Sequence, residues 1–429
     1  MTDRLRLLAN KPEVVASVAL GCVYLAFSGG HAYSIDGVLI YRQAVSIVHE
    51  HSLRFGTPIW WGETYVTSRY GIGLSLLYLP GVALLWWLGP LIPTPTAGAS
   101  YDWNLFYRDP VYVLGATPVQ ILVTVATAYL VARLIRELGF GSTTALVGLV
   151  GYGIASPAMV YARGDFAQPL LALCMTAALL AAVRFRKTAG RGALATVASF
   201  VCLAVLTRPV EGSFLLPAVL IVMVPNLPLS GWEASTYRVV ALVIGSFVAA
   251  VGLTLLVNWG RFGSPTETGY PSTVGWGTPL WVGLPGVLVS PARGIVWQFP
   301  LVLLAPLGLR RLWFTEHRVV AGVLGGLACL LLLNTASWMP WWGAWSWGSR
   351  LFVPALPLVA VLSAIGATSL AAPRRTRIVA VLMLGGVAWA LAGSLTNLLG
   401  GYAARYDGSA QSFALSGSTC RGSNGWSGN

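Results

Sequence analysis

The stretch 13–43 decides the class of fold: EVVASVALGCVYLAFSGG at 13–30 is followed by HAYSIDGVLIYRQ at 31–43. The first part is almost entirely apolar, and about 20 such residues form a helix that crosses a bilayer. Because no small-residue cleavage site follows it, the run predicts a retained membrane anchor rather than a signal peptide. The second part places a carboxylate, Asp36, just past the point where that helix would leave the bilayer.

The composition of the whole chain also predicts a membrane protein. Of its 429 residues, 56% are hydrophobic and only 10% are charged, whereas soluble domains carry about 25% charged residues. We therefore expect an all-α, polytopic membrane protein, because helices satisfy their own backbone polar groups in lipid. The net charge of +13 would suggest nucleic acid in a soluble protein. Here the basic residues form short clusters between apolar runs, so we expect membrane lipids and no nucleic acid as partners.

Three basic clusters decide the topology: RFRK at 184–187, RR at 310–311 and RRTR at 374–377. With a cytoplasmic N-terminus, all three face the cytoplasm if segment 69–91 does not cross the membrane, and all face outward if it does. The positive-inside rule favours the first arrangement. We therefore expect about eleven transmembrane helices, near 13–30, 111–132, 143–161, 167–183, 193–207, 211–225, 238–257, 295–309, 319–335, 351–370 and 378–397.

This topology divides the chain into a transmembrane domain, 1–400, and a Gly/Ser-rich external tail, 401–429, which we expect to be disordered. The first external loop, 31–110, would contain amphipathic helices and the membrane-associated segment 69–91. Most acidic residues and the tryptophan-rich stretches then lie on the outer face. An interfacial belt explains most of the tryptophans, and stacking on a sugar or lipid remains an alternative for the dense cluster at 338–347.

Asp36 opens a segment, GVLIYRQAVSIVHEHSL at 37–53, in which polar residues recur every three to four positions. That spacing predicts an amphipathic helix along the membrane surface. Asp36 has two compatible interpretations. It is a preferred residue for the N-cap of such a helix, and a carboxylate that is fixed in place can serve as a general base.

A second acid, Asp165, stands in YARGDFAQP at 161–169 between two predicted spans. Acids at membrane depth are costly and usually face a polar cavity. The alternative is a weak surface pair between Asp165 and the neighbouring Arg163. Further polar candidates lie at outward span ends, where arginine forks bind phosphate well but also commonly snorkel to the interface. They are Arg208, Arg261, Arg293 and Arg350, with Glu267 and Tyr270 in SPTETGY at 264–270.

Several of these stretches resemble the GT-C membrane glycosyltransferases, and most closely the protein-mannosyltransferase-like family. SIDGVLIYRQAVSIVHEHSLRFG (34–56) followed by SRYGIGLSLLYLPG (68–81) is similar to the first loop of bacterial members, and YARGDFAQPL (161–170) to the second external loop. NWGRFGSPTETGY (258–270), SPARGIVWQFP (290–300) and WSWGSRLFVPALPL (345–358) resemble further motifs of that branch. The resemblance runs from about residue 13 to about residue 370.

The resemblance implies an inverting glycosyl transfer at the external or periplasmic face of the cell membrane. The donor would be a polyprenyl-phosphate-linked sugar, and the acceptor a hydroxyl of a lipid, glycan or protein. By match to the loop acid, Asp36 would be the general base, and Asp165 would shape the same site. Arginines would stabilise the charge on the leaving phosphate, the candidates being Arg163, Arg208, Arg293 and Arg350, with Glu267 and Tyr270 beside them.

The chain departs from the family pattern at two positions. Many members carry two adjacent acids in the first loop, whereas here Gly37 follows Asp36. This weakens the case for a metal site, although a divalent cation, Mg²⁺ or Mn²⁺, stays an open alternative. Relatives also place an arginine early in the span after the first loop, and the nearest candidate here is Arg108, upstream of it. Which arginine would bind the phosphate therefore stays open.

Two other classes of function remain as alternatives. One is a flippase or transporter for lipid-linked sugars, and the other a glycan polymerase or ligase. A transporter should carry ionisable residues in mid-span and an internal repeat. The predicted spans here are nearly free of acids, which favours chemistry at the outer face.

Overall fold

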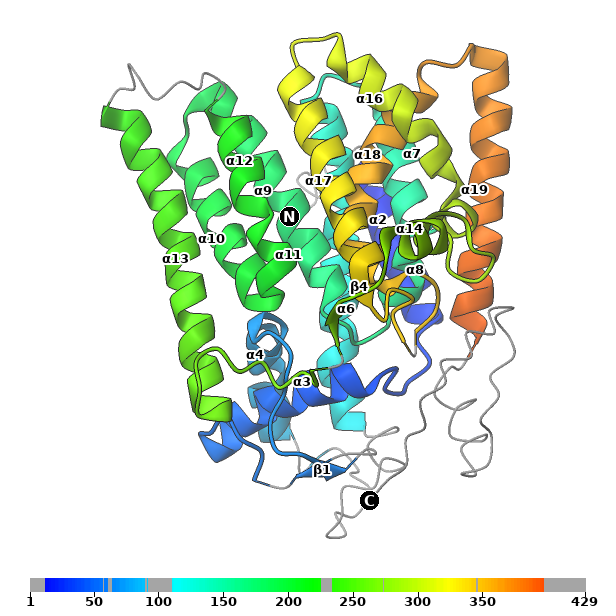
Figure 1. Ribbon diagram of the computed structural model, residues 1–429. Helices are drawn as coiled ribbons and strands as arrows, with labels where there is room; N and C mark the ends of the chain where they lie inside the picture. Colours follow the sequence, from blue (N-terminus) through cyan, green and yellow to red (C-terminus); the bar gives the residue numbers. More distant parts are fainter. Residues whose placement is uncertain are drawn as a thin grey trace.

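The computed structural model describes residues 12–56, 58–60, 64–88, 91, 110–224, 234–272, 274–344 and 346–396. These residues form a helical bundle with two short two-stranded sheets (Figure 1). The predicted tail, 401–429, and Arg108 lie outside the described residues. The helices that make up the bundle are α2 (Pro12–Ala26), α6 (Pro110–Glu137), α7 (Ser142–Gly153), α9 (Gln168–Thr188), α10 (Arg191–Thr207), α12 (Leu215–Met223), α13 (Ala234–Phe262), α16 (Ala305–Trp313), α17 (Arg318–Ser337), α18 (Leu356–Ala367) and α19 (Ala372–Leu395).

Six helical segments of the described chain are long and apolar enough to cross a membrane. Their burial differs with their place in the bundle. In the central helix α9, 83% of the most apolar window is buried, whereas in α13 only 11% is. α13 and α19 stand at opposite edges of the bundle (Figure 1). An apolar helix that the protein leaves uncovered needs lipid around it, so the chain is a multi-pass membrane protein. The number of eleven crossings stays a prediction.

The first loop folds against one end of the bundle through α3 (Ile35–Val45), a π-helical turn η1 (Ser46–Glu50) and α4 (Gly73–Leu88). Strands β1 (Ile59–Trp60) and β2 (Thr64–Tyr65) pair antiparallel beside them. The helix predicted after Asp36 is present, but it does not lie exposed on a membrane surface. Residues 37–44 of α3 are all buried, and the buried Arg42 pairs with Glu50 at 2.5 Å. The polar side chains that suggested a solvent-facing side are satisfied inside the loop.

Segment 69–91 contains α4, whose 16 residues extend about 24 Å, less than the ~30 Å of a bilayer core. Its start is fixed by close backbone packing. A Cβ on Gly71 or Gly73 would lie 2.3 Å from atoms of Thr207 at the end of α10. This close approach explains the two glycines. That the segment does not cross the membrane stays a prediction.

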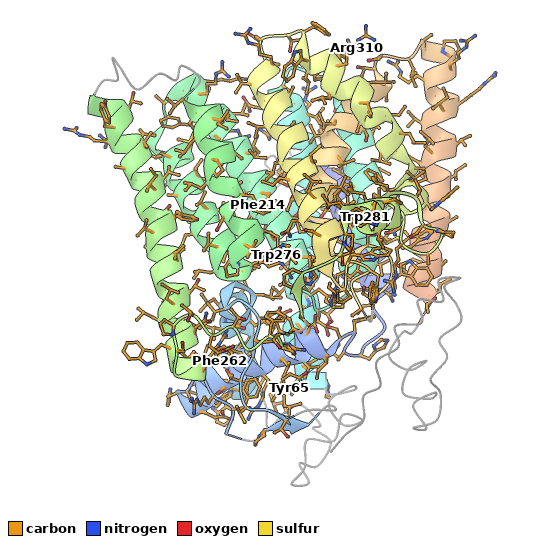
Figure 2. All side chains as sticks on the ribbon, viewed as in Figure 1. Tyr65, Phe214, Phe262, Trp276, Trp281 and Arg310 are labelled. Atoms are coloured by element: carbon orange, nitrogen blue, oxygen red, sulfur yellow. The ribbon has the colours of Figure 1, made fainter. Side chains whose placement is uncertain are left out.

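The basic clusters share the opposite end of the bundle. Glu137 accepts hydrogen bonds from Arg184 at 3.2 Å and Lys187 at 3.0 Å, and Arg311 donates to the carbonyl of Thr368. Figure 2 places Arg310 at this end and Tyr65 of the first loop at the other. The charge separation that the topology required is therefore present. That the basic end faces the cytoplasm stays a prediction.

The remaining short helical elements are α8 (Ala158–Tyr161), α11 (Pro209–Ser213), α14 (Leu280–Val289), α15 (Ile295–Gln298), η3 (Pro300–Leu304) and η4 (Arg350–Ala355). Strand β3 (Gly275–Trp276) pairs antiparallel with β4 (Trp338–Met339) and joins two loops that carry candidate residues. Helix α14 was not predicted, because ten residues that include Pro285 are too few for a span.

Candidate functional site

Asp36 lies in the first turn of α3, but it is not the residue that caps the helix. The N-cap is Ser34, whose hydroxyl accepts a hydrogen bond of 2.9 Å from the backbone N–H of Gly37. The expectation that Asp36 caps the helix is therefore wrong. Ser34 has the extended backbone that an N-cap requires, and its short side chain reaches the N–H. Asp36 still stabilises α3, because a negative charge in the first turn interacts favourably with the positive end of the helix dipole.

The Asp36 carboxylate is held by side chains from two different loops. Tyr70 donates to one of its oxygens at 2.6 Å, and a terminal nitrogen of Arg350 donates to the other at 2.6 Å. The side chain of Asp36 is 18% exposed. The Arg350 guanidinium lies over the ring of Phe166, 4.6 Å from its centre. The carboxylate is therefore ordered and partly accessible, as a proton acceptor must be.

Asp165 is fully buried and supports the start of α3. Its carboxylate accepts from the Ser34 hydroxyl at 2.6 Å, from the backbone N–H of Tyr33 at 2.9 Å and from the Tyr112 hydroxyl. Burial raises the pKa of the Asp165 carboxyl, and the hydrogen bonds from Ser34 and Tyr112 act against that shift. Through Ser34, Asp165 fixes the backbone from which Asp36 projects.

These carboxylates do not have the arrangement of a divalent-cation site. The described residues contain no group of three His, Cys, Asp or Glu side chains that could hold a metal. Asp36 is paired with a guanidinium, and Asp165 is enclosed by protein donors. A hard cation needs several free oxygen ligands, which these two carboxylates do not offer in the contacts described, and Mg²⁺ or Mn²⁺ stays an alternative that these contacts do not favour.

Three of the predicted site residues lie apart from Asp36 and bond to backbone groups. Arg163 donates to the carbonyls of Phe27 at 2.8 Å and Gly393 at 3.1 Å, which ties the ends of α2 and α19 together. Arg293 donates to the carbonyls of Ser346 and Gly348. Glu267 is exposed and accepts from backbone N–H groups of its own loop.

A cavity of about 380 Å³, here called the polar cavity for the arginines Arg69, Arg208 and Arg261 among its lining residues, lies beside the Tyr70 that bonds to Asp36. Tyr70, which donates to Asp36, is part of its wall. Arg208 also lines it and pairs with Glu211 at 2.6 Å. The aromatic wall is formed by Tyr270, Trp276 and Trp338, of which the two tryptophan rings meet edge to face at 5.3 Å. Of the predicted residues, Arg208 and Tyr270 therefore line the cavity, and Asp36, with its partner Arg350, is linked to the cavity wall through Tyr70.

Arg261 is the most unusual residue of this cavity. It is 3% exposed and donates to the carbonyl of Tyr70 at 2.7 Å. Its other nitrogens, Nε and Nη2, are buried and have no hydrogen-bond partner among the described residues. Buried N–H groups without acceptors are costly, so Nε and Nη2 of Arg261 are the groups of this side chain that a further acceptor would stabilise.

Sequence reasoning gave less weight to Arg261 and missed Arg69 altogether. The Arg69 guanidinium lies over the rings of Tyr65 and Tyr270, at 5.3 and 5.5 Å from their centres, and lines the same cavity. Both arginines occur in stretches that resemble the family, SRYG and NWGRFG. What distinguishes them is that both line the polar cavity, and the spacing of residues in the sequence does not show this.

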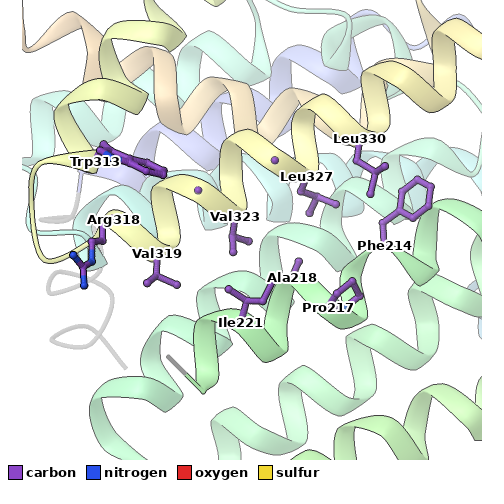
Figure 3. A pocket seen from close by; sticks show the side chains of 12 residues that line it. Phe214, Pro217, Ala218, Ile221, Trp313, Arg318, Val319, Val323, Leu327 and Leu330 are labelled. Carbon is purple, nitrogen blue, oxygen red and sulfur yellow. The ribbon is translucent and has the colours of Figure 1, made fainter. Parts of the chain in front are cut away.

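An apolar groove of about 610 Å³ runs between α12 and α17 (Figure 3). It extends from Trp313 and Arg318 at the basic end to Phe214 and Leu330. Leu330 is one helical turn from Asn334, which lines the polar cavity, and Phe214 follows three residues after Glu211. The groove therefore ends beside the polar cavity.

Solved structures of two membrane proteins share this arrangement of helices. ArnT from Cupriavidus metallidurans, bound to undecaprenyl phosphate, superimposes with a TM-score of 0.55 over 86% of this chain, at 14% identity. The archaeal oligosaccharyltransferase AglB from Archaeoglobus fulgidus, in complex with an inhibitory peptide and a dolichol-phosphate, matches with a TM-score of 0.54 over 90% of this chain, at 11% identity.

The chain has the GT-C fold. The fold that the sequence resemblance implied is thus confirmed, while the protein-mannosyltransferase-like subfamily stays a prediction. The chain spans 62% of the length of ArnT and 56% of that of AglB. No family model and no curated protein sequence matches it.

Proposed function

We propose that this protein is a membrane glycosyltransferase that uses a polyprenyl-phosphate-linked sugar as donor. One observation carries the proposal: the cavity lined by Arg261, whose Nε and Nη2 have no partner among the described residues, lies beside Asp36 and adjoins an apolar groove. A phosphate and a long apolar chain are the two parts of such a donor. The solved ArnT and AglB structures contain undecaprenyl phosphate and dolichol-phosphate respectively, which supports the same class of ligand here.

In this proposal the prenyl chain lies in the groove between α12 and α17, and the phosphate lies in the polar cavity. Arg261 supplies its two unused N–H groups to phosphate oxygens, and Arg69 adds a second positive charge. Arginine binds phosphate through parallel hydrogen bonds in a fixed geometry. The neutral pair of Arg208 and Glu211, with the aromatic wall, is left to contact the sugar.

The proposed reaction is a single displacement at the anomeric carbon. Asp36 accepts the proton of an acceptor hydroxyl while the hydroxyl oxygen forms a bond to that carbon. The bond from the carbon to the phosphate oxygen breaks, its electron pair stays on the phosphate, and the configuration inverts. Hydrogen-bond donors of the protein that face the developing phosphate charge, in a site shielded from water, accelerate such a step strongly. The acceptor is a lipid, glycan or protein hydroxyl.

We place this reaction at the external or periplasmic face of the cell membrane, because the basic end of the bundle lies opposite the site. A transporter for lipid-linked sugars is disfavoured, since the acids at the site gather at one end of the helices rather than in mid-span. A glycan polymerase or ligase would use the same donor chemistry and differ only in the acceptor.

The test is transfer by the purified protein in lipid nanodiscs, with a panel of labelled polyprenyl-phosphate hexoses and pentoses. We expect release of polyprenyl phosphate in step with labelled product for at least one donor. Asp36→Asn should lower kcat by roughly 100- to 10,000-fold, the range for loss of a general base. Glu267→Gln, which changes an exposed acid of the same face, is the control. An Asp36→Asn protein as active as wild type would refute the role of the base.

A further inference from the structure

The four arginines first predicted to contact phosphate differ in the groups that hold them. Arg163 and Arg293 donate to backbone carbonyls, and Arg208 pairs with Glu211. Arg350 instead donates to Asp36, at 2.6 Å from Nη1 to Oδ2. Its Nε is buried and has no hydrogen-bond partner within the described part of the chain. The side chain of Arg350 is 13% exposed.

The backbone of the loop that leads into Arg350 is held in place by hydrogen bonds from other elements. Arg293 donates to the carbonyls of Ser346 and Gly348, and Gln298 accepts from the backbone N–H of Ser349 at 3.0 Å. The hydroxyl of Tyr161 donates to the carbonyl of Trp347 at 2.6 Å. The ring of Phe166 then supports the guanidinium from one face. The position of the Arg350 head group is therefore determined by the protein alone.

Asp36 meets this fixed guanidinium on one oxygen and the Tyr70 hydroxyl on the other. Tyr70 is itself fixed, because its carbonyl accepts from Arg261. Two anchors on opposite oxygens prevent rotation of the carboxylate. Each carboxylate oxygen can accept two hydrogen bonds, so lone pairs remain for a substrate proton.

We propose that Arg350 is a positioning residue for the base and does not bind the donor phosphate. This inference rests on the proposed function. Arg350 keeps the Asp36 carboxylate at one angle, and its charge takes the place of a cation beside the carboxylate. The phosphate is left to Arg261 and Arg69, which line the cavity, whereas the Arg350 guanidinium contacts Asp36 and Phe166.

Steady-state kinetics at varied concentrations of the sugar donor distinguish a residue that positions the base from one that binds the phosphate. For Arg350→Gln we expect kcat to fall about 100-fold, the effect of a misplaced reacting group, while KM for the donor stays nearly constant. Arg261→Gln is the matched variant: kcat should fall there too, because the developing charge loses a hydrogen-bond donor, but KM for the sugar donor should also rise because a ground-state contact to phosphate is lost. Arg350→Lys should keep part of kcat, and guanidinium ions added to Arg350→Ala should restore part of it.

Either of two kinetic results would overturn the inference. One is a higher donor KM with unchanged kcat for Arg350→Gln, which would make Arg350 a phosphate ligand. The other is wild-type kinetics for that variant.

A second measurement does not depend on turnover. The melting temperatures of Asp36→Asn, Arg350→Gln and the double variant form a cycle. We expect the double variant to lose no more than the larger single loss, since the two residues share one contact. Additive losses would show that Arg350 does not hold Asp36. If wild type transfers no sugar from any donor, the proposed function fails, and the cycle still decides whether Arg350 fixes Asp36.

Discussion

At the scale of single residues, close packing around Gly37 explains why no acid stands next to Asp36. A Cβ built on Gly37 would lie 2.2 Å from Cγ of Asp165, far inside van der Waals contact. The space that an adjacent side chain would need is filled by the carboxylate that fixes Ser34.

Replacement of Gly37 by alanine should therefore disturb Asp165 and, through Ser34, the position of Asp36. We expect a lower melting temperature, from a loss of about 1–3 kcal/mol of unfolding free energy that is typical of overpacking, together with lower kcat. Gly192→Ala in α10, where a Cβ meets no atom within 4 Å, is the control. Wild-type kcat and melting temperature in Gly37→Ala would mean that Asp165 does not pack against this glycine.

Single residues also show which parts of the candidate site the sequence could indicate and which it could not. Asp36 and Tyr270 could be proposed as site residues because an acid after a span and a motif of the external loop are both visible in the sequence, and their role stays a prediction. The choice among arginines was not visible. Arg163 and Arg261 are both buried arginines, and each has a buried Nε without a partner among the described residues. Only the three-dimensional contacts show that both terminal nitrogens of Arg163 bond to carbonyls, whereas Nη2 of Arg261 has no partner among the described residues.

At the scale of elements, the proposed function assigns the prenyl chain to the groove between α12 and α17, apart from the site of sugar transfer. Gly326 of α17 lines this groove, and a Cβ there meets no atom within 4 Å. Gly326→Phe should fill the groove without displacing a neighbour. We expect KM to rise roughly tenfold for long-chain donors, the worth of about two buried methylenes, and to change little for donors with short chains.

Gly245→Phe on α13, another glycine with open space around it, controls for a new aromatic ring in a span. An equal rise of KM for short and long chains in Gly326→Phe would place the prenyl chain elsewhere.

Helices were predicted better than the segments between them. Every predicted span overlaps a helix, because apolar runs of this length have no other stable form in lipid. The burial of α3 could not be predicted, since its polar residues are satisfied by partners such as Glu50, Leu53 and Thr67 that come later in the chain. The pairing of β3 with β4 joins residues more than 60 positions apart, and two-residue strands leave no periodic signal.

At the scale of the whole molecule, the charge distribution predicts which side of the membrane carries the site. In a variant without the native cysteines, cysteine at position 267 should react with a membrane-impermeant thiol reagent in intact cells. Cysteine at position 310 should react only after permeabilisation, because Arg310 lies at the basic end. The reverse labelling would move the proposed reaction to the cytoplasmic side.

Helix α13 links this molecule to the thickness of its bilayer. Its 29 residues extend about 43 Å, more than the ~30 Å hydrocarbon core, and most of its surface is uncovered by protein. Such a helix tilts when the surrounding lipids are short and straightens when they are long. Arg261 stands in its last turn. On the proposed function, the depth and angle of that guanidinium would follow the acyl-chain length of the host membrane, and lipid composition would then help to determine how the site holds the donor phosphate.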